Sequence, residues 1–422
     1  MAAQPAASPL DRPAPSPEHR PAPRRPHGAT TQVAIIGGGP SGLLLARLLQ
    51  LSGVRSIVIE RQSEAHVMAR IRAGVLEQGT VALLQKAEIG DRLVREGLVH
   101  HGFDLAVNGR RFRIAMDDLI GRHVTVYGQT EVTKDLMVAH HQAGTEMYHE
   151  VEDVALHDLE TDAPAVTFTR HGEPWRVTAD FVVGCDGFRG PSRQAIPAAK
   201  RAEFERVYPF GWLGILADVP PCQDELIYAN SDRGFALASM RSPTRSRYYI
   251  QCPADEDIAN WPDDRLWEAL KQRLGPDVAA SITTGPAIEK SIAPLRSFVC
   301  ETMQHGRLFL AGDAAHIVPP TGAKGLNLAV GDVHYLATAL IAFYANGEER
   351  GLRQYSTVAL RRIWKAERFS WMLTTLLHDF DDDDTFGRRM KVAELDYIFS
   401  SRAAQISIAE NYVGLPYDDV LA

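Results

Sequence analysis

Apolar and polar positions alternate regularly only after the first thirty residues of the chain. The β-branched run 31–36 is followed by a turn of glycines and by the apolar helical stretch 43–51, and a second apolar run occupies 56–59. Short apolar runs that alternate with helical segments are typical of a sheet whose strands are buried on both faces. The pattern therefore predicts an α/β fold that opens with a strand, a helix and a second strand.

Residues 1–30 are rich in Pro, Ala, Arg and His and contain no apolar run long enough for a secretory signal. An arginine-bearing targeting peptide is the alternative, but Asp11, Glu18 and the frequent prolines fit an amphipathic helix poorly. We therefore expect a disordered extension over 1–30.

Short β-prone runs fill the middle of the chain, and helical periodicity fills its end. The runs 210–218, 225–228, 235–239 and 247–251 predict an antiparallel sheet. From about residue 331 onward the apolar residues recur at helical spacing.

Composition narrows the classes of function. The 422 residues are 45% hydrophobic and 23% charged, which suits a soluble protein of two or three domains. The formal net charge of -8 argues against nucleic acid as a partner, because phosphate binding favours a basic surface. No apolar run approaches the roughly 20 residues that cross a bilayer, so we expect a cytoplasmic protein without a membrane partner.

Cysteine usage predicts neither a disulfide framework nor a metal site. The four cysteines Cys185, Cys222, Cys252 and Cys300 lie far apart without a C-x-x-C pair, and we interpret them as reduced thiols. The acidic run 379–384 has no accompanying histidine or ligand spacing, so it predicts a solvated loop and no metal.

The first glycine turn has the G-x-G-x-x-G spacing of a dinucleotide site. Gly37 permits the tight turn, Gly39 allows a pyrophosphate to approach beside Ser41, and Gly42 allows close packing of helix on strand. Glu60 ends the second strand about 20 residues later, where an acid can bind ribose hydroxyls.

Two further strand–turn–helix patterns follow the fingerprint. The segment 181–193 carries an Asp-Gly turn at Asp186, and 306–316 carries a Gly-Asp turn at Asp313. Each pair alone marks only a loop. In this order and spacing, the three motifs resemble the FAD-binding set of the aromatic-hydroxylase class of flavoproteins. A second glycine fingerprint for a separate nicotinamide domain is absent from the sequence.

The β-prone region carries residues suited to a carboxylate. Ser239, Arg241 and Tyr249 lie on neighbouring predicted strands with Tyr228. The planar guanidinium of an arginine pairs with both oxygens of a carboxylate, and hydroxyls complete the set.

Over most of the chain the resemblance is to one particular family of this class. From Thr31 to about Pro416 the sequence is similar to the 4-hydroxybenzoate hydroxylase family. The similarity is clearest at 71–78, 126–131, 206–212 and 316–327. This resemblance implies a homodimer that uses FAD, O2 and NADPH or NADH to form 3,4-dihydroxybenzoate through a flavin hydroperoxide. The alternatives are hydroxylation of another hydroxylated aromatic acid, an FAD reductase or dehydrogenase without oxygen insertion, and a non-catalytic FAD-binding protein.

The resemblance also implies roles for single residues. Ser239, Arg241 and Tyr249 would bind the substrate carboxylate, Tyr228 its phenol, and Tyr412 would pass the proton on. His100 would be the solvent end of this relay; without the resemblance, a solvated histidine is the simpler interpretation. Pro320 would line the reacting centre. The implied cofactor contacts, beyond the glycine turn and Glu60, are Arg70, Arg72, Gln129, Asp186, Arg247, Asp313, Lys324 and Asn327.

The residues after Glu60 bear on nucleotide preference. Arg61, Gln62 and His66 follow it; Arg61 is suited to an extra phosphate, while Glu64 would repel one. We expect a slight preference for NADPH with some use of NADH.

The expected organisation has a discontinuous FAD-binding domain, a β-sheet substrate domain and a helical C-terminal part. The ranges are 31–100, 180–200 and 290–330 for the first, 101–179 and 201–289 for the second, and 331–422 for the third.

Overall fold

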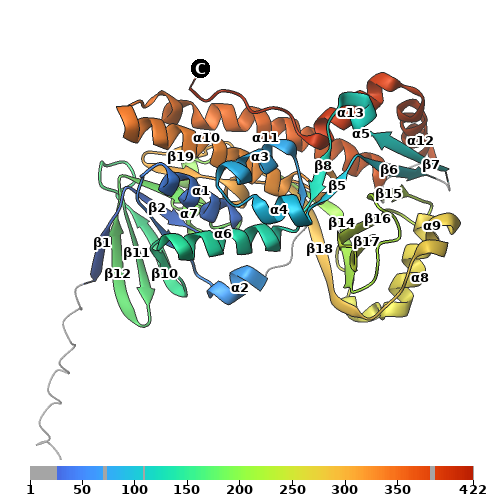
Figure 1. Ribbon diagram of the computed structural model, residues 1–422, viewed down its shortest axis with the longest axis horizontal. Coiled ribbons are helices and arrows are strands. Elements are labelled where there is room, and N and C mark those ends of the chain that lie inside the picture. Colours follow the sequence, from blue (N-terminus) through green and yellow to red (C-terminus); the bar gives the residue numbers. More distant parts are fainter. Residues whose placement is uncertain (1–25, 70–73, 108–109, 381–384, 422) are drawn as a thin grey trace, which may run out of the picture.

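The computed structural model describes residues 26–69, 74–107, 110–380 and 385–421 (Figure 1). The elements form two halves, one around a parallel sheet and one around a large, mostly antiparallel sheet. The long helices α10 (Gly325–Asn346) and α11 (Arg350–Leu377) run along one side of the molecule. The expected α/β fold with a helical C-terminal part is confirmed, although the C-terminal helices begin at residue 325 and not at 331.

A sheet that is parallel except at one edge, called the parallel sheet below, forms the core of the first half. Its strands, in spatial order, are β19 (Gln304–His305), β20 (Leu308–Leu310), β13 (Phe181–Gly184), β2 (Val33–Ile36), β3 (Ser56–Ile59) and β9 (Met147–Tyr148). Every residue of β2 is buried. Uninterrupted burial explains the unbroken apolar run, because layers of structure cover both faces of such a strand.

Helices and two small sheets surround the parallel sheet. The helices are α1 (Pro40–Leu51), α2 (Glu64–Ala69), α3 (Gln78–Lys86), α4 (Asp91–Glu96), α6 (Gln129–Ala143) and α7 (Pro191–Gln194). One small sheet has the order β1 (His27–Thr30), β12 (Glu173–Thr178), β11 (Ala165–Arg170) and β10 (Val151–His157). The other has the order β4 (Val75–Leu76), β8 (Val124–Val126) and β5 (Leu98–His100).

The second half contains an eight-stranded sheet. Its order is β21 (His316–Ile317), β18 (Ala287–Cys300), β14 (Glu203–Ala217), β17 (Arg245–Pro253), β16 (Ala236–Ser242), β15 (Ile227–Asn230), β6 (Gly102–Val107) and β7 (Arg110–Ala115). The helices of this half are α5 (Met116–Ile120), α8 (Asp263–Leu274), α9 (Pro276–Ser281), α12 (Thr385–Ser400) and α13 (Arg402–Val413). Short 3-10 turns lie at η1 (Ala198–Lys200), η2 (Ile258–Asn260), η3 (Gly312–Ala314) and η4 (Pro320–Gly322).

The two faces of this sheet have different cores. On one face Tyr248 and Ile250 pack against Trp267 and Leu270 of α8. On the other face, Tyr228 and other side chains pack against residues of α11 and α13. The second face is the one that carries the candidate substrate residues.

Three expected boundaries are wrong. Residues 27–30, expected to be disordered, form β1, which pairs in parallel with β12 and stacks His27 on Trp175 at 4.9 Å. The expected substrate range 101–179 is divided, because β9 joins the parallel sheet and β10–β12 share its core. Residues 290–300, expected in the FAD-binding domain, lie in β18 of the large sheet.

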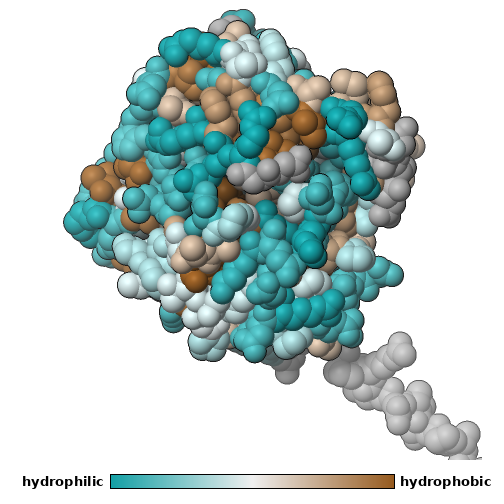
Figure 2. Space-filling model, turned by 90° about the vertical axis from the view of Figure 1, so that its right-hand side faces the viewer, coloured by the Kyte–Doolittle hydropathy of each residue, from teal (hydrophilic) through white to brown (hydrophobic). Residues whose placement is uncertain are grey.

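Helix α10 is long and apolar enough to span a membrane by length and composition alone. Most of it is buried, and it shares a core with α1 and α11, as the central helix of a soluble protein does. The expectation that no segment approaches this length is therefore wrong, although the burial explains the hydropathy. The face shown in Figure 2 is mostly polar, with hydrophobic side chains in separate patches.

The buried His378 predicts a loss of stability in acid. It accepts a hydrogen bond from Trp212 Nε1 at 2.7 Å and lies next to the carbonyl of Thr374, which fixes its neutral form. Burial lowers the pKa of His378 from 6.5 to about 3. Between these values the unfolded chain binds a proton that the folded chain excludes, so the free energy of unfolding falls as pH falls through 6.5.

We expect the wild type to lose more stability than His378→Gln between pH 7 and pH 5, by roughly 2 kcal/mol. Urea unfolding of the FAD-loaded protein at both pH values measures the difference. The matched control is the exposed His66→Gln, which should behave as wild type does. An equal pH dependence in His378→Gln and wild type would contradict the assignment.

Candidate active site

The three sequence motifs meet at one edge of the parallel sheet. β2, β3, β13 and β20 are mutually parallel neighbours, so their carboxyl ends lie together. The glycine turn follows β2, Glu60 follows β3, Asp186 follows β13 and Gly312 follows β20. Ligands of open α/β sheets bind at this edge. The convergence that the motif order predicts is therefore present in the structure.

The glycine turn leaves space at the N-terminus of α1. Gly37 has φ +109°, and a Cβ there would collide with the carbonyl of Cys185. A Cβ at Gly42 would collide with the carbonyl of Gly37, so both positions require glycine. At Gly39, by contrast, a Cβ would meet no atom within 4 Å. This open space beside the positive end of a helix dipole fits a pyrophosphate.

The carboxylate of Glu60 is oriented by the backbone. Its Oε2 accepts from Gly38 N at 2.6 Å and its Oε1 from Gln62 N at 2.7 Å. Each oxygen keeps a further lone pair. Glu60 is thus positioned to accept ribose hydroxyls, and the arrangement suits the adenosine part of FAD.

Asp186 belongs to the Asp-Gly turn. Its Oδ2 accepts from Ser192 N at 2.8 Å at the start of α7, and its Oδ1 has no hydrogen-bond partner among the described residues. Burial raises the pKa of Asp186.

The Gly-Asp turn is held against the glycine turn. Gly312, at φ +64°, donates from its N–H to Asp332 Oδ2 at 2.9 Å, and a Cβ at Gly312 would press on Ser41 Oγ. The same Asp332 oxygen lies 2.6 Å from His316 Nε2, and this buried carboxylate raises the pKa of His316 against the opposing effect of burial. Asp313 itself is exposed at this edge. Its expected role toward the ribityl chain stays a prediction.

Lys324 and Asn327 are buried in a polar network. Lys324 Nζ donates to Glu77 Oε1 at 2.7 Å and to the carbonyl of Tyr412 at 3.0 Å, so Lys324 is not a surface charge. Arg362 pairs with the other oxygen of Glu77 at 2.6 Å. Asn327 Oδ1 accepts from Glu77 N at 3.0 Å. Both candidates therefore connect α10 to the β4–α3 segment.

The candidate substrate residues lie on adjacent strands of the large sheet. Tyr228 is paired with Leu237, which is paired with Tyr249, and Ser239 is paired with Arg247. Because side chains alternate along a strand, Tyr228, Ser239, Arg241 and Tyr249 share one face. Gly214 keeps this face open, since a Cβ there would lie 2.7 Å from the ring of Tyr249.

Arg241 is a half-buried cation without an acidic partner among the described residues. Its NH1 donates to the carbonyl of Met240 at 2.9 Å, and its Nε has no hydrogen-bond partner. Burial lowers the pKa of Arg241, and nearby Arg247 acts in the same direction. Within the described ranges no carboxylate lies within 4.0 Å of its guanidinium, so the site favours an external anion.

Arg247 and Ser239 have partners of their own. Arg247 NH1 lies 3.1 Å from Glu289, its NH2 donates to Ser291 Oγ at 2.9 Å, and its guanidinium lies 5.0 Å from the centre of the Tyr249 ring. Ser239 Oγ donates to the carbonyl of Arg247 at 2.7 Å, which leaves the oxygen lone pairs available. The expected influence of Arg247 on the flavin stays a prediction.

Two buried phenols form a direct hydrogen bond. The hydroxyls of Tyr228 and Tyr412 are 2.8 Å apart, and either can donate. Burial raises the pKa of Tyr228 to about 12 and raises that of Tyr412 well above its usual value. Phe103 stacks on Tyr412 at 4.2 Å and packs edge-on to Tyr228 at 5.7 Å. Both phenols therefore stay protonated at neutral pH and can hold a proton between them.

His100 is not at the surface. It is 0% exposed at the end of β5, and neither ring nitrogen has a hydrogen-bond partner among the described residues. Burial lowers the pKa of His100 to about 4. The interpretation of His100 as a solvated histidine is therefore wrong, while its expected role at the end of the relay stays a prediction.

Other candidates are placed less directly. Arg70 and Arg72 lie outside the described residues. Gln129 is the first residue of α6, after Gly128. Pro320 is the first residue of η4. Ala323, the residue directly after η4, has φ +53°.

The nucleotide-preference residues lie at the surface. Arg61 and His66 are exposed, and Gln62 is half-buried beside Glu60. Glu64 Oε2 lies 3.0 Å from His141 Nε2.

Sequence reasoning missed three residues that organise the site. Glu77 joins Lys324 and Arg362, and Asp332 joins Gly312 to His316. Phe103 packs against both phenols. Acidic residues before or within apolar helices give no motif, so only burial distinguishes them.

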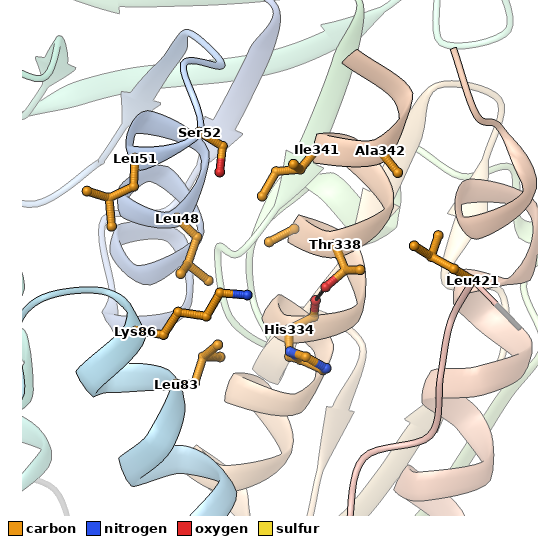
Figure 3. A pocket seen from close by; sticks show the side chains of 11 residues that line it. Leu48, Leu51, Ser52, Leu83, Lys86, His334, Thr338, Ile341, Ala342 and Leu421 are labelled. Carbon is orange, nitrogen blue, oxygen red and sulfur yellow. Dashed lines mark hydrogen bonds between the residues drawn. The ribbon is translucent and has the colours of Figure 1, made fainter. Parts of the chain in front are cut away.

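A pocket of about 290 Å³ lies away from these residues (Figure 3). Leu48, Leu83 and Ile341 line it with Lys86 and His334, between α1, α3 and α10. None of the candidate site residues is among its lining residues. It is therefore separate from the candidate active site.

Comparisons with known proteins agree with this arrangement. The family described as "FAD binding domain" matches residues 30–370. The chain is 56% identical over 389 residues to p-hydroxybenzoate hydroxylase of Acinetobacter baylyi, covering 92% of this chain and 96% of that protein. It is 29% identical to rifampicin monooxygenase of Streptomyces venezuelae over 74% of this chain and 64% of that protein.

Among solved structures, p-nitrophenol 4-monooxygenase from Pseudomonas putida superposes with a TM-score of 0.78 at 21% identity, over 92% of this chain and 99% of that one. This likeness supports the fold. The 56% identity to the Acinetobacter enzyme and the match to the family model show that the chain belongs to the p-hydroxybenzoate hydroxylase family of FAD-dependent aromatic hydroxylases.

Proposed function

We propose that this FAD-dependent hydroxylase converts 4-hydroxybenzoate to 3,4-dihydroxybenzoate, with O2 and NAD(P)H as co-substrates. The observation that carries the proposal is the uncompensated guanidinium of Arg241 on the same sheet face as the buried hydroxyl pair of Tyr228 and Tyr412. A para-hydroxylated aromatic acid carries the two groups that these residues complement.

The carboxylate end of the substrate would bind at Arg241. Arg241 Nε and the hydroxyl of Tyr249 can donate to the carboxylate oxygens, and Ser239 would join them by turning its hydroxyl away from the carbonyl of Arg247. The bound carboxylate removes the cost of burying Arg241 without a counter-charge. The rigid backbone of β16 and β17 fixes the distance of the clamp from Tyr228.

At the other end, Tyr228 would accept the proton of the substrate phenol and pass its own proton to Tyr412. When bound, FAD reduced by NAD(P)H supplies the activated oxygen that an electron-rich ring carbon attacks. A phenolate ring is richer in electrons than a phenol, so this proton transfer favours hydroxylation. The apolar surroundings of Phe103 and Tyr228 exclude water from the reacting centre.

Oxygen consumption by the FAD-loaded enzyme, with product analysis, tests the function. We expect 4-hydroxybenzoate to stimulate NAD(P)H oxidation and to yield 3,4-dihydroxybenzoate in near-equal amount. Conversion of a different hydroxylated acid alone would correct the substrate. Oxidation of NAD(P)H without a hydroxylated product from any such acid would instead favour a reductase or dehydrogenase.

His100 is proposed to receive the proton from the tyrosine pair after a local movement, since no direct bond joins them here. In His100→Gln we expect slower proton release when 4-hydroxybenzoate binds, with little change in affinity. Stopped-flow measurement with a pH indicator follows the release. The exposed variant His141→Gln should release protons as wild type does, and equal rates in all three proteins would exclude His100.

Nucleotide preference rests on Arg61, which is exposed where an added phosphate could pair with it. We propose a slight preference for NADPH with use of NADH. Arg61→Ala should reduce the preference, as the ratio of kcat/KM for the two nucleotides measures.

We also propose that the protein is a cytoplasmic homodimer, as the resemblance implies. The four free cysteines suit a reducing compartment. Sedimentation equilibrium of the FAD-loaded protein distinguishes a dimer from a monomer.

A further inference from the structure

A histidine–aspartate–histidine cluster lies outside the candidate active site. His101, Asp117 and His123 each offer one ligand atom, and these atoms all lie within 4.8 Å of one another. His101 Nδ1 contacts Asp117 Oδ2, and His123 Nδ1 lies 3.6 Å from Asp117 Oδ1. The rings of the two histidines are 5.7 Å apart and inclined edge to face. No step of the proposed hydroxylation uses this cluster.

One atom of the cluster is left without a partner. Asp117 Oδ1 is buried and accepts no hydrogen bond from any described residue. His123 Nδ1 points toward it from beyond hydrogen-bond distance. The separation of His123 Nδ1 from Asp117 Oδ1 is close to that between neighbouring ligand atoms around a zinc ion, whose bonds to nitrogen and oxygen are about 2.0–2.2 Å. His101 Nδ1 and Asp117 Oδ2 are closer, and a bound ion would replace their hydrogen bond.

We propose that His101, Asp117 and His123 form a surface site for a divalent late transition-metal ion of the zinc type. Imidazole nitrogens prefer such ions over Mg²⁺ or Ca²⁺, which favour sites made of oxygen ligands. With neutral imidazoles the carboxylate gives the three side chains a net negative charge, which attracts a cation. The half-exposed positions of all three leave a fourth coordination position for water.

The backbone holds the three ligands in place. His101 lies between β5 and β6, Asp117 in the first turn of α5, and His123 directly before β8. Asp117 N donates to the carbonyl of His101 at 3.2 Å. The pairing of β5 with β8, through His100 and Val124, fixes the residues next to both histidines. Figure 1 shows β5 and β8 where the two halves of the molecule meet.

A bound ion would therefore cross-link three segments that are separate in sequence. An ion that binds the folded chain and has no such site in the unfolded chain stabilises the fold by mass action. We expect added Zn²⁺ to raise the Tm of the protein, and this stabilisation to require all three side chains.

Equilibrium dialysis of untagged, EDTA-treated holoenzyme against Zn²⁺ tests the site, with bound zinc counted by atomic absorption. The variants are His101→Gln, His123→Gln and Asp117→Asn. Each should bind one zinc fewer per chain than wild type and lose the rise in Tm. FAD absorbance confirms that each variant is folded.

The matched control is His141→Gln, because exposed His141 also pairs with a carboxylate, that of Glu64, but has no second histidine. It should bind as much zinc as wild type. Equal zinc in wild type and the three site variants overturns the proposal, as does an equal loss in the control. Binding of Mg²⁺ or Ca²⁺ in preference to Zn²⁺ would overturn the assigned class of ion.

Discussion

Replacement of Arg241 with alanine is expected to weaken 4-hydroxybenzoate binding by a factor of about thirty to several thousand. Removing one partner of a buried charge pair costs roughly 2 to 5 kcal/mol, which corresponds to this range of dissociation constants. The Nε of Arg241 is buried without a hydrogen-bond partner and Arg241 lacks an acidic partner of its own, so the substrate carboxylate would supply the missing charge. Titration of the FAD-loaded variant by flavin fluorescence measures the dissociation constant.

Two further variants separate the clamp from general charge. Arg245→Ala removes an exposed arginine of the same hairpin, which pairs with Asp218 at 2.6 Å, and should bind substrate as wild type does. Arg241→Lys keeps the charge without the planar fork and should give an intermediate affinity. Unchanged affinity in Arg241→Ala with normal FAD content would remove Arg241 from the substrate site.

Tyr228→Phe is expected to uncouple the reaction. The ring and its packing against Phe103 remain, but the hydroxyl that lies 2.8 Å from Tyr412 is lost. Substrate should still bind through Ser239, Arg241 and Tyr249 and should still stimulate NAD(P)H oxidation. The ring then stays a neutral phenol, so we expect product per NAD(P)H to fall by about tenfold or more, within the usual contribution of general acid–base catalysis.

Quantifying 3,4-dihydroxybenzoate and hydrogen peroxide per NAD(P)H oxidised measures the coupling. Tyr248→Phe is the matched control, because Tyr248 is a buried phenol of the same sheet whose ring faces Trp267 on the opposite side. It should remain coupled. If Tyr228→Phe is as tightly coupled as wild type, proton transfer through Tyr228 is wrong.

Local patterns were sufficient for the nucleotide-binding part of the fold. Gly37 and Gly42 are required by the backbone itself, through a positive φ at the first and a close carbonyl contact at the second. Such requirements act over a few residues, so they are visible in sequence. The order of the three motifs likewise specified their meeting point, because parallel strands place their carboxyl ends at one edge.

Domain boundaries could not be predicted in the same way. Strands β10–β12 are short β-prone runs, and so are strands β15 and β16 of the substrate sheet. Such a run predicts a strand but does not predict which core buries it. Their assignment to the first half depended on contacts with β1 and β9, which only the tertiary structure supplies.

The chemical state of single side chains was also decided by tertiary structure. The sequence alone determined that this chain has an α/β fold with a dinucleotide edge, and its resemblance indicated a carboxylate clamp with paired tyrosines. It did not determine that His100 is buried, that Lys324 pairs with Glu77, or that His101, Asp117 and His123 meet. Burial and charge pairing depend on residues distant in sequence, whereas turns and strands depend on neighbours, which is why only the latter were readable along the chain.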